Sequence, residues 1–322
     1  MSLYKKISII GAGRIGALLA ADLMTFEKLE TVTLFDSKSN YVTGKVLDLS
    51  HRQGVFGHTT PTIEVGETPE DLAGSDVVVI TASAPYTDIS KRAEVTRQNA
   101  ELITTLGKDV QRHCPDAFVI MVTNPVDVMT YWFQKAANHP KDKILGLSGE
   151  LDRGRLRTEL QQKLDQDLSS LEIPVLGAHW PNTVYLFQHA YLNGTPLSDI
   201  LSIEEFSTLA KKASNGGAEI IDLLKNESTA YGPAAALMRM ISALDQETST
   251  RITGSTLLVG EYGWQDVAAG MDVLVQDGQI HQVIEYDLGE ETQNTLDSSI
   301  QQTADLLSDL QSHFQNLMQE SA

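Results

Sequence analysis

The segment Ile7-Ser-Ile-Ile-Gly-Ala-Gly-Arg-Ile-Gly16 gives the strongest indication of the fold. Its apolar start predicts a buried strand, and its glycines predict a tight turn that opens a helix. Gly11 permits the turn, Gly13 lets a pyrophosphate approach the backbone, and Gly16 lets the helix pack closely on the strand. The N-terminus of that helix favours negative phosphate groups. The cofactor contacts predicted in this loop are Gly11, Gly13, Arg14, Ile15 and Gly16.

Asp36 supplies the second feature of a dinucleotide site. It ends the second predicted strand, about twenty residues after the glycine motif. A carboxylate there accepts hydrogen bonds from both hydroxyls of an adenine ribose and repels a 2′-phosphate. The sequence therefore predicts NAD, in preference to NADP, as the cofactor. A glycine motif alone is weak evidence because a simple tight turn has the same pattern, but its place between strand and helix strengthens the prediction.

The pattern around this motif alternates short apolar runs with longer helical stretches. Such alternation predicts a parallel sheet with crossover helices. Two of the runs, residues 76–81 and 118–123, are continuously apolar, which is typical of central strands covered on both faces. The strongest strand candidates are residues 7–10, 31–35, 76–81 and 118–123.

The second half of the chain has a different pattern. It combines a helix from Leu151, a run of strands between residues 173 and 191, and helical segments around residues 204–224. Apolar residues at helical intervals then predict a long terminal helix that begins at Glu290.

Together these patterns predict the α/β fold class. We expect a Rossmann-type parallel-sheet domain that binds NAD in residues 1–147. A mixed α+β catalytic domain with the long C-terminal helix is expected to follow in residues 148–322.

The composition excludes several kinds of partner. The chain has 24 Lys and Arg and 43 Asp and Glu, a formal charge of −19. This charge repels phosphate backbones and anionic lipid surfaces, so we expect no nucleic-acid and no membrane partner. Cys114 is the one cysteine, which predicts neither an intrachain disulfide nor a cysteine-based metal site. We expect a cytoplasmic protein that needs no metal.

Beyond the glycine motif, the chain resembles the lactate and malate dehydrogenases over nearly its whole length. Five segments carry the resemblance, and their order and spacing are more specific than any one of them. The resemblance implies an NAD-dependent L-2-hydroxy acid dehydrogenase that moves a hydride between NADH and a 2-oxo acid. The segments are Gly11 to Gly16 with Asp36, Ile80-Thr-Ala82 with Arg92 and Asn99, Thr123-Asn-Pro-Val-Asp127, Leu151-Asp-Arg-Gly-Arg-Leu-Arg157, and Gly177-Ala-His179.

The resemblance assigns the acid–base chemistry to His179. An imidazole with a pKa near the working pH can take the hydroxyl proton and return it. Asp152 matches the aspartate that binds the second imidazole nitrogen, and its alternative role is that of a carboxylate at a helix N-terminus. Arg155, one helical turn on, matches the arginine that clamps the substrate carboxylate with two parallel hydrogen bonds.

Further site residues follow from the same resemblance. Arg92 matches the loop arginine that polarises the reacting carbonyl. Asn124 and Thr229 match residues that contact the substrate, and Tyr86 takes the position that selects among substrates. The other cofactor contacts that the resemblance implies are Thr81, Ala82, Asn99, Thr123, Asn124 and Pro233.

The closing loop departs from the family in ways that bear on the substrate. Malate dehydrogenases carry an arginine for the second carboxylate where this chain has Tyr86, and Asp88 would repel that carboxylate. This favours a lactate/pyruvate-type monocarboxylate. The alternative is malate and oxaloacetate, with Lys91 as the substitute cation. A second alternative is a non-catalytic relative that only binds NAD, and a third is a different dehydrogenase that shares only the cofactor domain.

Two further expectations concern the neighbour of His179 and the oligomeric state. The apolar ring of Trp180, next to His179, predicts an imidazole whose charged form is disfavoured. The resemblance further implies a homodimer or a homotetramer, with active sites near the subunit contacts.

Overall fold

The computed structural model describes residues 4–26, 29–57, 61–84, 92–179, 182–225 and 227–320. The side chains of Arg92 and of residues 316–320 lie outside this description. A sheet of nine strands runs through the molecule in the order β13-β12-β11-β6-β5-β4-β1-β2-β3. Its strands are β1 (Lys6–Ile10), β2 (Thr31–Phe35), β3 (Thr62–Val65), β4 (Val77–Ile80), β5 (Phe118–Met121), β6 (Ile144–Gly146), β11 (Thr250–Val259), β12 (Gln265–Gln276) and β13 (Gln279–Val283).

The first six strands in the sequence are parallel, as alternating strands and helices predict. The chain builds β1, β2 and β3 in one direction and then crosses back to place β4 on the other side of β1. Ligands of open α/β sheets bind at such a reversal, outside the carboxyl ends of the strands. The α/β fold class with a Rossmann-type sheet is thus confirmed.

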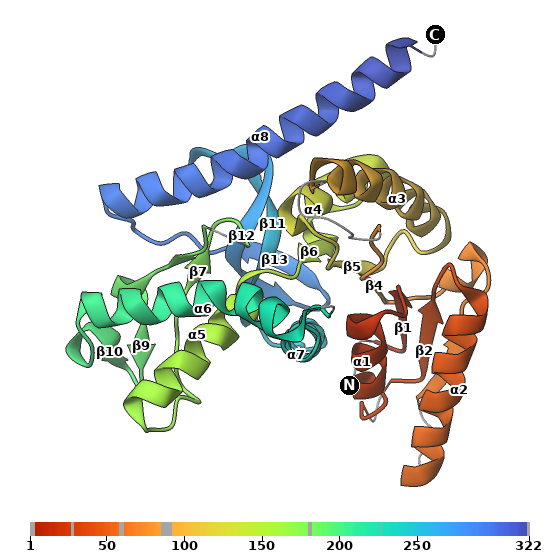
Figure 1. Ribbon diagram of the computed structural model, residues 1–322, viewed down its shortest axis with the longest axis horizontal. Helices are drawn as coiled ribbons and strands as arrows, with labels where there is room; N and C mark the ends of the chain where they lie inside the picture. The colour runs from red at the N-terminus through yellow and green to blue at the C-terminus, as the bar shows by residue number, and fades with distance from the viewer. Residues whose placement is uncertain are drawn as a thin grey trace.

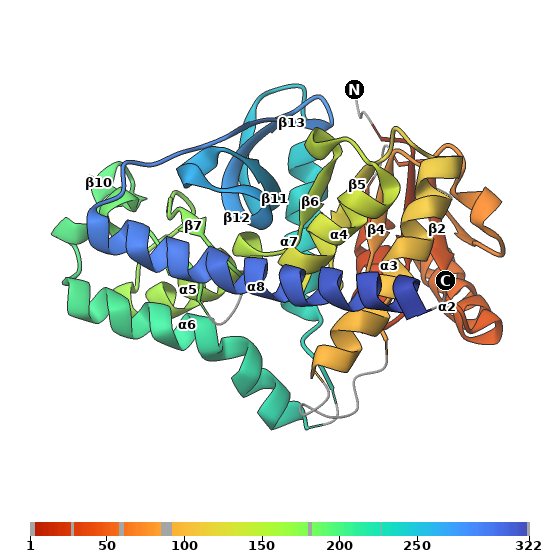
Figure 2. The same ribbon diagram turned by 90° about the horizontal axis from the view of Figure 1, so that it is seen from above.

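Eight helices of the described chain surround or extend this sheet (Figure 1). They are α1 (Arg14–Leu23), α2 (Ser39–Phe56), α3 (Arg92–His113), α4 (Val126–Ala137), α5 (Gly149–Leu164), α6 (Ile203–Leu224), α7 (Tyr231–Leu244) and α8 (Glu290–Glu320). Figure 2 shows that α8 passes along the second half of the chain and then beside α3 and α4. The terminal helix therefore contacts both halves of the molecule.

The predicted run of strands between residues 173 and 191 is shorter than the sequence indicates. It consists of the two-residue strands β7 (Val175–Leu176) and β8 (Val184–Tyr185), which pair with each other, and of β9 (Tyr191–Leu192), which pairs with β10 (Thr195–Pro196). A turn of 3₁₀ helix at Phe187–His189 separates β8 from β9. This leaves short hairpins in place of a regular sheet.

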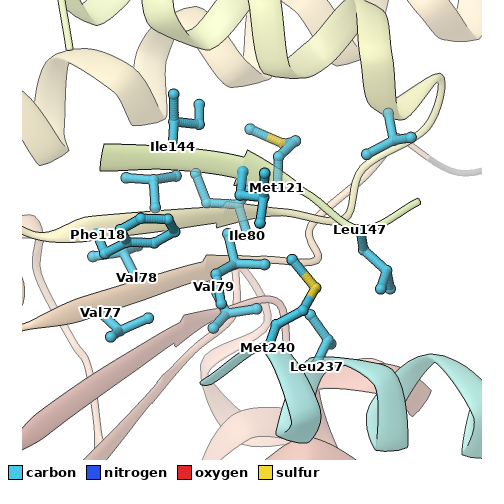
Figure 3. Close-up of a cluster of buried hydrophobic side chains, with 14 of the residues drawn as sticks. Val77, Val78, Val79, Ile80, Phe118, Met121, Ile144, Leu147, Leu237 and Met240 are labelled. Atoms are coloured by element: carbon cyan, nitrogen blue, oxygen red, sulfur yellow. The ribbon is translucent and has the colours of Figure 1, made fainter. Parts of the chain in front are cut away.

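The main core forms where the central strands meet α7 (Figure 3). All four residues of β4 and of β5 are buried, which agrees with their continuous apolar sequences. Leu237 and Met240 of α7 pack against this layer, so the core joins the predicted cofactor half to the second half. A smaller apolar cluster lies between α5 and α6.

Candidate functional site

The glycine loop lies at the carboxyl end of β1. Gly11 has a φ of +115°, which favours glycine, and its N–H donates to the carbonyl of Phe35 at 2.8 Å. A Cβ on Gly16 would overlap the carbonyl oxygen of Gly11, whereas a Cβ on Gly13 would meet nothing within 4 Å. Gly16 is thus required by close helix packing, and the space beside Gly13 is open to a ligand.

Asp36 lies beside this loop, directly after β2. Its carboxylate accepts the backbone N–H of Ala12 and that of Lys38, each at 3.0 Å. The side chain is therefore held against the glycine loop.

Polar side chains tie the ends of the neighbouring strands together. The Thr81 hydroxyl donates to the carbonyl of Gly11 at 2.9 Å, and the Thr123 hydroxyl donates to the carbonyl of Ala82 at 2.7 Å. Asn99, buried on α3, accepts the N–H of Ala84 and donates to the carbonyl of Asn124, each at 2.7 Å. The cofactor residues predicted at 81, 82, 99, 123 and 124 thus lie along one edge of the sheet.

An ion pair brings the segment before α7 to the glycine loop. Arg14 donates to the carboxylate of Glu227, and helices α1 and α7 pack against each other. Thr229 and Pro233 follow in this segment, with Pro233 buried at the start of α7. Glu227 was not predicted from the sequence, because no local pattern marks it as the partner of a residue 213 positions away.

His179 and Asp152 form the central contact of the second half. The Nδ1–H of the imidazole donates to the Asp152 carboxylate at 2.8 Å, and the two side chains are 18% and 2% exposed. Asp152 is in the first turn of α5, and His179 follows β7. This contact fixes the tautomer that leaves Nε2 free to accept a proton.

The pKa of His179 is raised above its ordinary value. Burial alone would lower it, but the attraction and the hydrogen bond of Asp152 favour the charged imidazole and prevail. The expectation drawn from Trp180, that the charged form is disfavoured, is therefore wrong in direction. Trp180 itself lies outside the described residues.

Arg155 reaches the same carboxylate from the next turn of α5. Its Nη1 lies 3.3 Å from Oδ1 of Asp152, and its side chain is 17% exposed. On the facing helix α6, a Cβ at Gly217 would lie 2.8 Å from Nη2 of Arg155. A glycine at this position gives the guanidinium room, and no pattern in the sequence marked Gly217 as a site residue.

The remaining predicted residues are placed only in part. Arg92 begins α3, but its side chain is not described, and Tyr86, Asp88 and Lys91 lie outside the described residues. Over the described ranges, no group of three or more His, Cys, Asp or Glu side chains is arranged to hold a metal ion. No described helix is both long enough and apolar enough to cross a membrane.

Comparisons with known proteins agree with this arrangement. Residues 5–146 match the NAD binding domain of lactate/malate dehydrogenase, and residues 149–316 match its alpha/beta C-terminal domain. A malate dehydrogenase of Bacillus cytotoxicus is 35% identical over 305 residues, which cover 94% of this chain and 97% of the relative.

Solved structures of the same family are also similar. The malate dehydrogenase of Cryptosporidium parvum superposes with a TM-score of 0.90 at 32% identity, over 96% of this chain and 99% of that one. The lactate dehydrogenase of Eimeria maxima, solved with NADH and oxamate, superposes with a TM-score of 0.91 at 28% identity, over 96% of this chain and 95% of that one.

These matches confirm the resemblance drawn from the five sequence segments and the prediction of NAD as the cofactor. The chain belongs to the lactate/malate dehydrogenase family of NAD-dependent oxidoreductases.

Proposed function

We propose that this protein catalyses reversible hydride transfer between NADH and the 2-position of a 2-oxo acid, with His179 as the acid and base. The observation that carries the proposal is the contact of His179 with Asp152 at 2.8 Å, with Arg155 on the same carboxylate. An oriented, chargeable imidazole next to a guanidinium is what reduction of an anionic 2-oxo acid requires.

The first half of the chain supplies residues that fit the cofactor. Gly11 and Gly16 let the loop pack closely against its neighbours, and the space beside Gly13 is open at the start of helix α1, where a pyrophosphate binds favourably. Asp36 would hold the adenine ribose, and the residues along the strand ends would lie beside the nicotinamide half. When bound, NADH supplies the hydride.

The second half supplies the groups that act on the substrate. Arg155 binds the carboxylate next to the reacting carbon, and protonated His179 donates its proton from Nε2 to the carbonyl oxygen. Asp152 stabilises the imidazolium before that transfer. Arg92, Asn124 and Thr229 keep the roles that the resemblance implies, in which Arg92 polarises the carbonyl and the other two contact the substrate.

Malate and oxaloacetate are the substrate pair we propose. Support comes from the relatives, since the matched Bacillus sequences and several of the similar structures carry the name malate dehydrogenase. The preference for a monocarboxylate, which the sequence analysis drew from Tyr86, finds less support. Lactate and pyruvate remain the second candidate because Tyr86 replaces the arginine expected for a second carboxylate, and lactate dehydrogenases are among the similar structures.

The test is NADH oxidation by the purified protein with oxaloacetate, pyruvate and larger 2-oxo acids, followed by loss of absorbance. If malate and oxaloacetate are the substrates, we expect the highest kcat/KM with oxaloacetate. In that case, loss of this preference in Lys91→Ala would identify Lys91 as the cation that binds the second carboxylate. A higher kcat/KM with pyruvate contradicts the malate proposal and supports the interpretation of Tyr86. The variant Tyr86→Arg then serves as the matched control and should shift preference towards oxaloacetate.

We also propose that the protein acts in the cytoplasm as a homodimer or homotetramer. Apolar side chains exposed on α2 and α6 support an assembly, since such surfaces mark protein contacts. Sedimentation as a monomer at micromolar concentration would contradict it, and the variant Leu223→Glu should weaken it. The exposed residues that motivate the proposal are Leu47, Val55, Ile220, Ile221, Leu223 and Leu224.

A further inference from the structure

The terminal helix α8 contacts the backbone next to His179 through one hydroxyl. Ser299 is fully buried on this helix. Its Oγ accepts the backbone N–H of Ala178 at 2.8 Å and donates to the backbone carbonyl of Asn182 at 2.7 Å. His179 lies between these two contact points in the sequence, so Ser299 joins both ends of the segment that carries the imidazole.

The local geometry suits a serine at this position. A hydroxyl can accept one hydrogen bond and donate another, which few side chains of this size can do. Gly177 has a φ of +84°, and a Cβ on it would lie 2.6 Å from the Ser299 Oγ. The glycine therefore allows the helix to approach closely enough for both hydrogen bonds.

Other groups hold the remaining polar atoms of the same segment. Gly177 exchanges two backbone hydrogen bonds of 2.9 Å with Gly270 on β12. The N–H of His179 donates to Oδ2 of Asp127, a buried residue of α4, at 3.1 Å. The backbone of residues 177–179 is thus held by β12, α4 and α8, while Asp152 holds the imidazole from α5.

We propose that Ser299 is a positioning residue for His179, which holds the histidine backbone at the place where the imidazole meets Asp152. The inference rests on the proposed function, because it assumes that His179 exchanges the substrate proton. Loss of the hydroxyl leaves the Ala178 N–H and the Asn182 carbonyl without this partner and lets the segment move. Small displacements of a reacting group lower turnover strongly.

Loss of Ser299 should also change the titration of His179. The charged groups that face the imidazole are Asp152 and Arg155 from α5 and Asp127 from α4. Asp152 opposes the effect of burial and so raises the pKa, and a looser contact with Asp152 weakens that support. Reduction of a 2-oxo acid needs protonated His179, so the decline of its rate with rising pH should begin at a lower pH.

The experiment compares Ser299→Ala with wild type and with Thr303→Val. Thr303 is also buried on α8, one turn further along, and its variant controls for the loss of a buried hydroxyl on this helix. We expect Ser299→Ala to lower kcat by about tenfold or more, to leave the KM for NADH unchanged, and to shift the pH profile to lower pH. Thr303→Val should retain the kcat and pH profile of wild type, even if its Tm falls.

The outcomes separate the two proposals. If wild type is active and Ser299→Ala has the same kcat and pH profile as Thr303→Val, the positioning role of Ser299 is overturned and the proposed function stands. Absence of wild-type turnover with every 2-oxo acid overturns the proposed function and this inference with it. If Ser299→Ala does not fold, Ser299→Cys, which keeps a small but weaker hydrogen-bonding group, should give an intermediate kcat and pH shift. A wild-type pH profile in Ser299→Cys would then count against the inference.

Discussion

At the scale of single residues, the carboxylate of Asp152 controls the charge of His179. The pairing of these two residues was predicted from the sequence, because the resemblance assigned a role to each of them. The direction that the sequence predicted for the pKa shift of His179 was wrong. That direction depends on the competition between burial and a carboxylate at 2.8 Å, and a neighbouring tryptophan in the sequence is a poor guide to it.

Replacing Asp152 by Asn should weaken both catalysis and acid stability. We expect kcat to fall by about 10²–10⁴-fold, because the amide no longer stabilises the imidazolium. A raised histidine pKa contributes stability that is present in acid and is lost as pH rises through the folded-state pKa. The variant's deficit in unfolding free energy should therefore be larger at about pH 5 than at about pH 9. An equal deficit at both pH values, measured by urea denaturation, would contradict this account.

Two glycines of the cofactor loop should respond differently to the same added methyl group. Gly16→Ala should lower Tm and weaken NADH binding, because its Cβ overlaps the Gly11 carbonyl. Gly13→Ala should retain Tm but raise the Kd for NADH about tenfold or more, because its Cβ enters the open space that a pyrophosphate would use. Thermal unfolding and fluorescence titration measure both effects. Equal Tm losses in the two variants would show that Gly13 is constrained by the fold and not by a ligand.

At the scale of elements, helix α5 is held by a network of charges, buried except for Arg239, that the sequence did not reveal. Glu150 pairs with Arg153 at 2.7 Å and with Arg239 of α7 at 2.8 Å. Arg153 also reaches Asp272 of β12 at 2.8 Å. The network joins α5, which carries Asp152, to two elements nearly a hundred residues or more away. Local patterns predict that α5 is a helix, but they contain no information on partners at such separations.

Removing one member of this network should destabilise the protein strongly. Glu150→Ala leaves buried Arg153 without one of its partners, and such a change costs about 3–5 kcal/mol of unfolding free energy. Lys163→Ala is the matched control on the same helix, because it breaks an exposed pair with Glu205 and should change stability little. Urea denaturation measures both. Similar losses of unfolding free energy in the two variants would show that burial of an ion pair does not determine how much its loss destabilises the protein.

At the scale of the whole molecule, one sheet and one main core cross the boundary predicted near residue 147. Four of the six parallel strands (β1, β2, β4 and β5) were predictable from their apolar sequences, and so was the terminal helix, whereas the short strands β3 and β6 were not predicted. The junction between the two halves of the sheet could not be predicted, because β11 pairs with β6 through Ser255 and Gly146, which are far apart in the sequence. We propose that residues 1–147 and 148–322 divide the work, with the cofactor in the first unit and acid–base chemistry in the second.

The shared sheet and core should make the two units unfold together. We expect one thermal transition by calorimetry, with the calorimetric and van't Hoff enthalpies in agreement. NADH should raise the temperature of the whole transition, because it binds the folded state. Two separate transitions, of which NADH shifts only one, would show that the units are independent despite their common sheet.

The role of His179 is tested by comparing wild type with His179→Asn for NADH binding and for NADH oxidation by oxaloacetate and pyruvate. We expect nearly unchanged NADH affinity, because the glycine loop and Asp36 are untouched, and a loss of turnover of about 10²–10⁴-fold or more. Turnover by His179→Asn at a rate close to that of wild type would contradict the assignment of His179 as the acid and base, and with it the proposed mechanism.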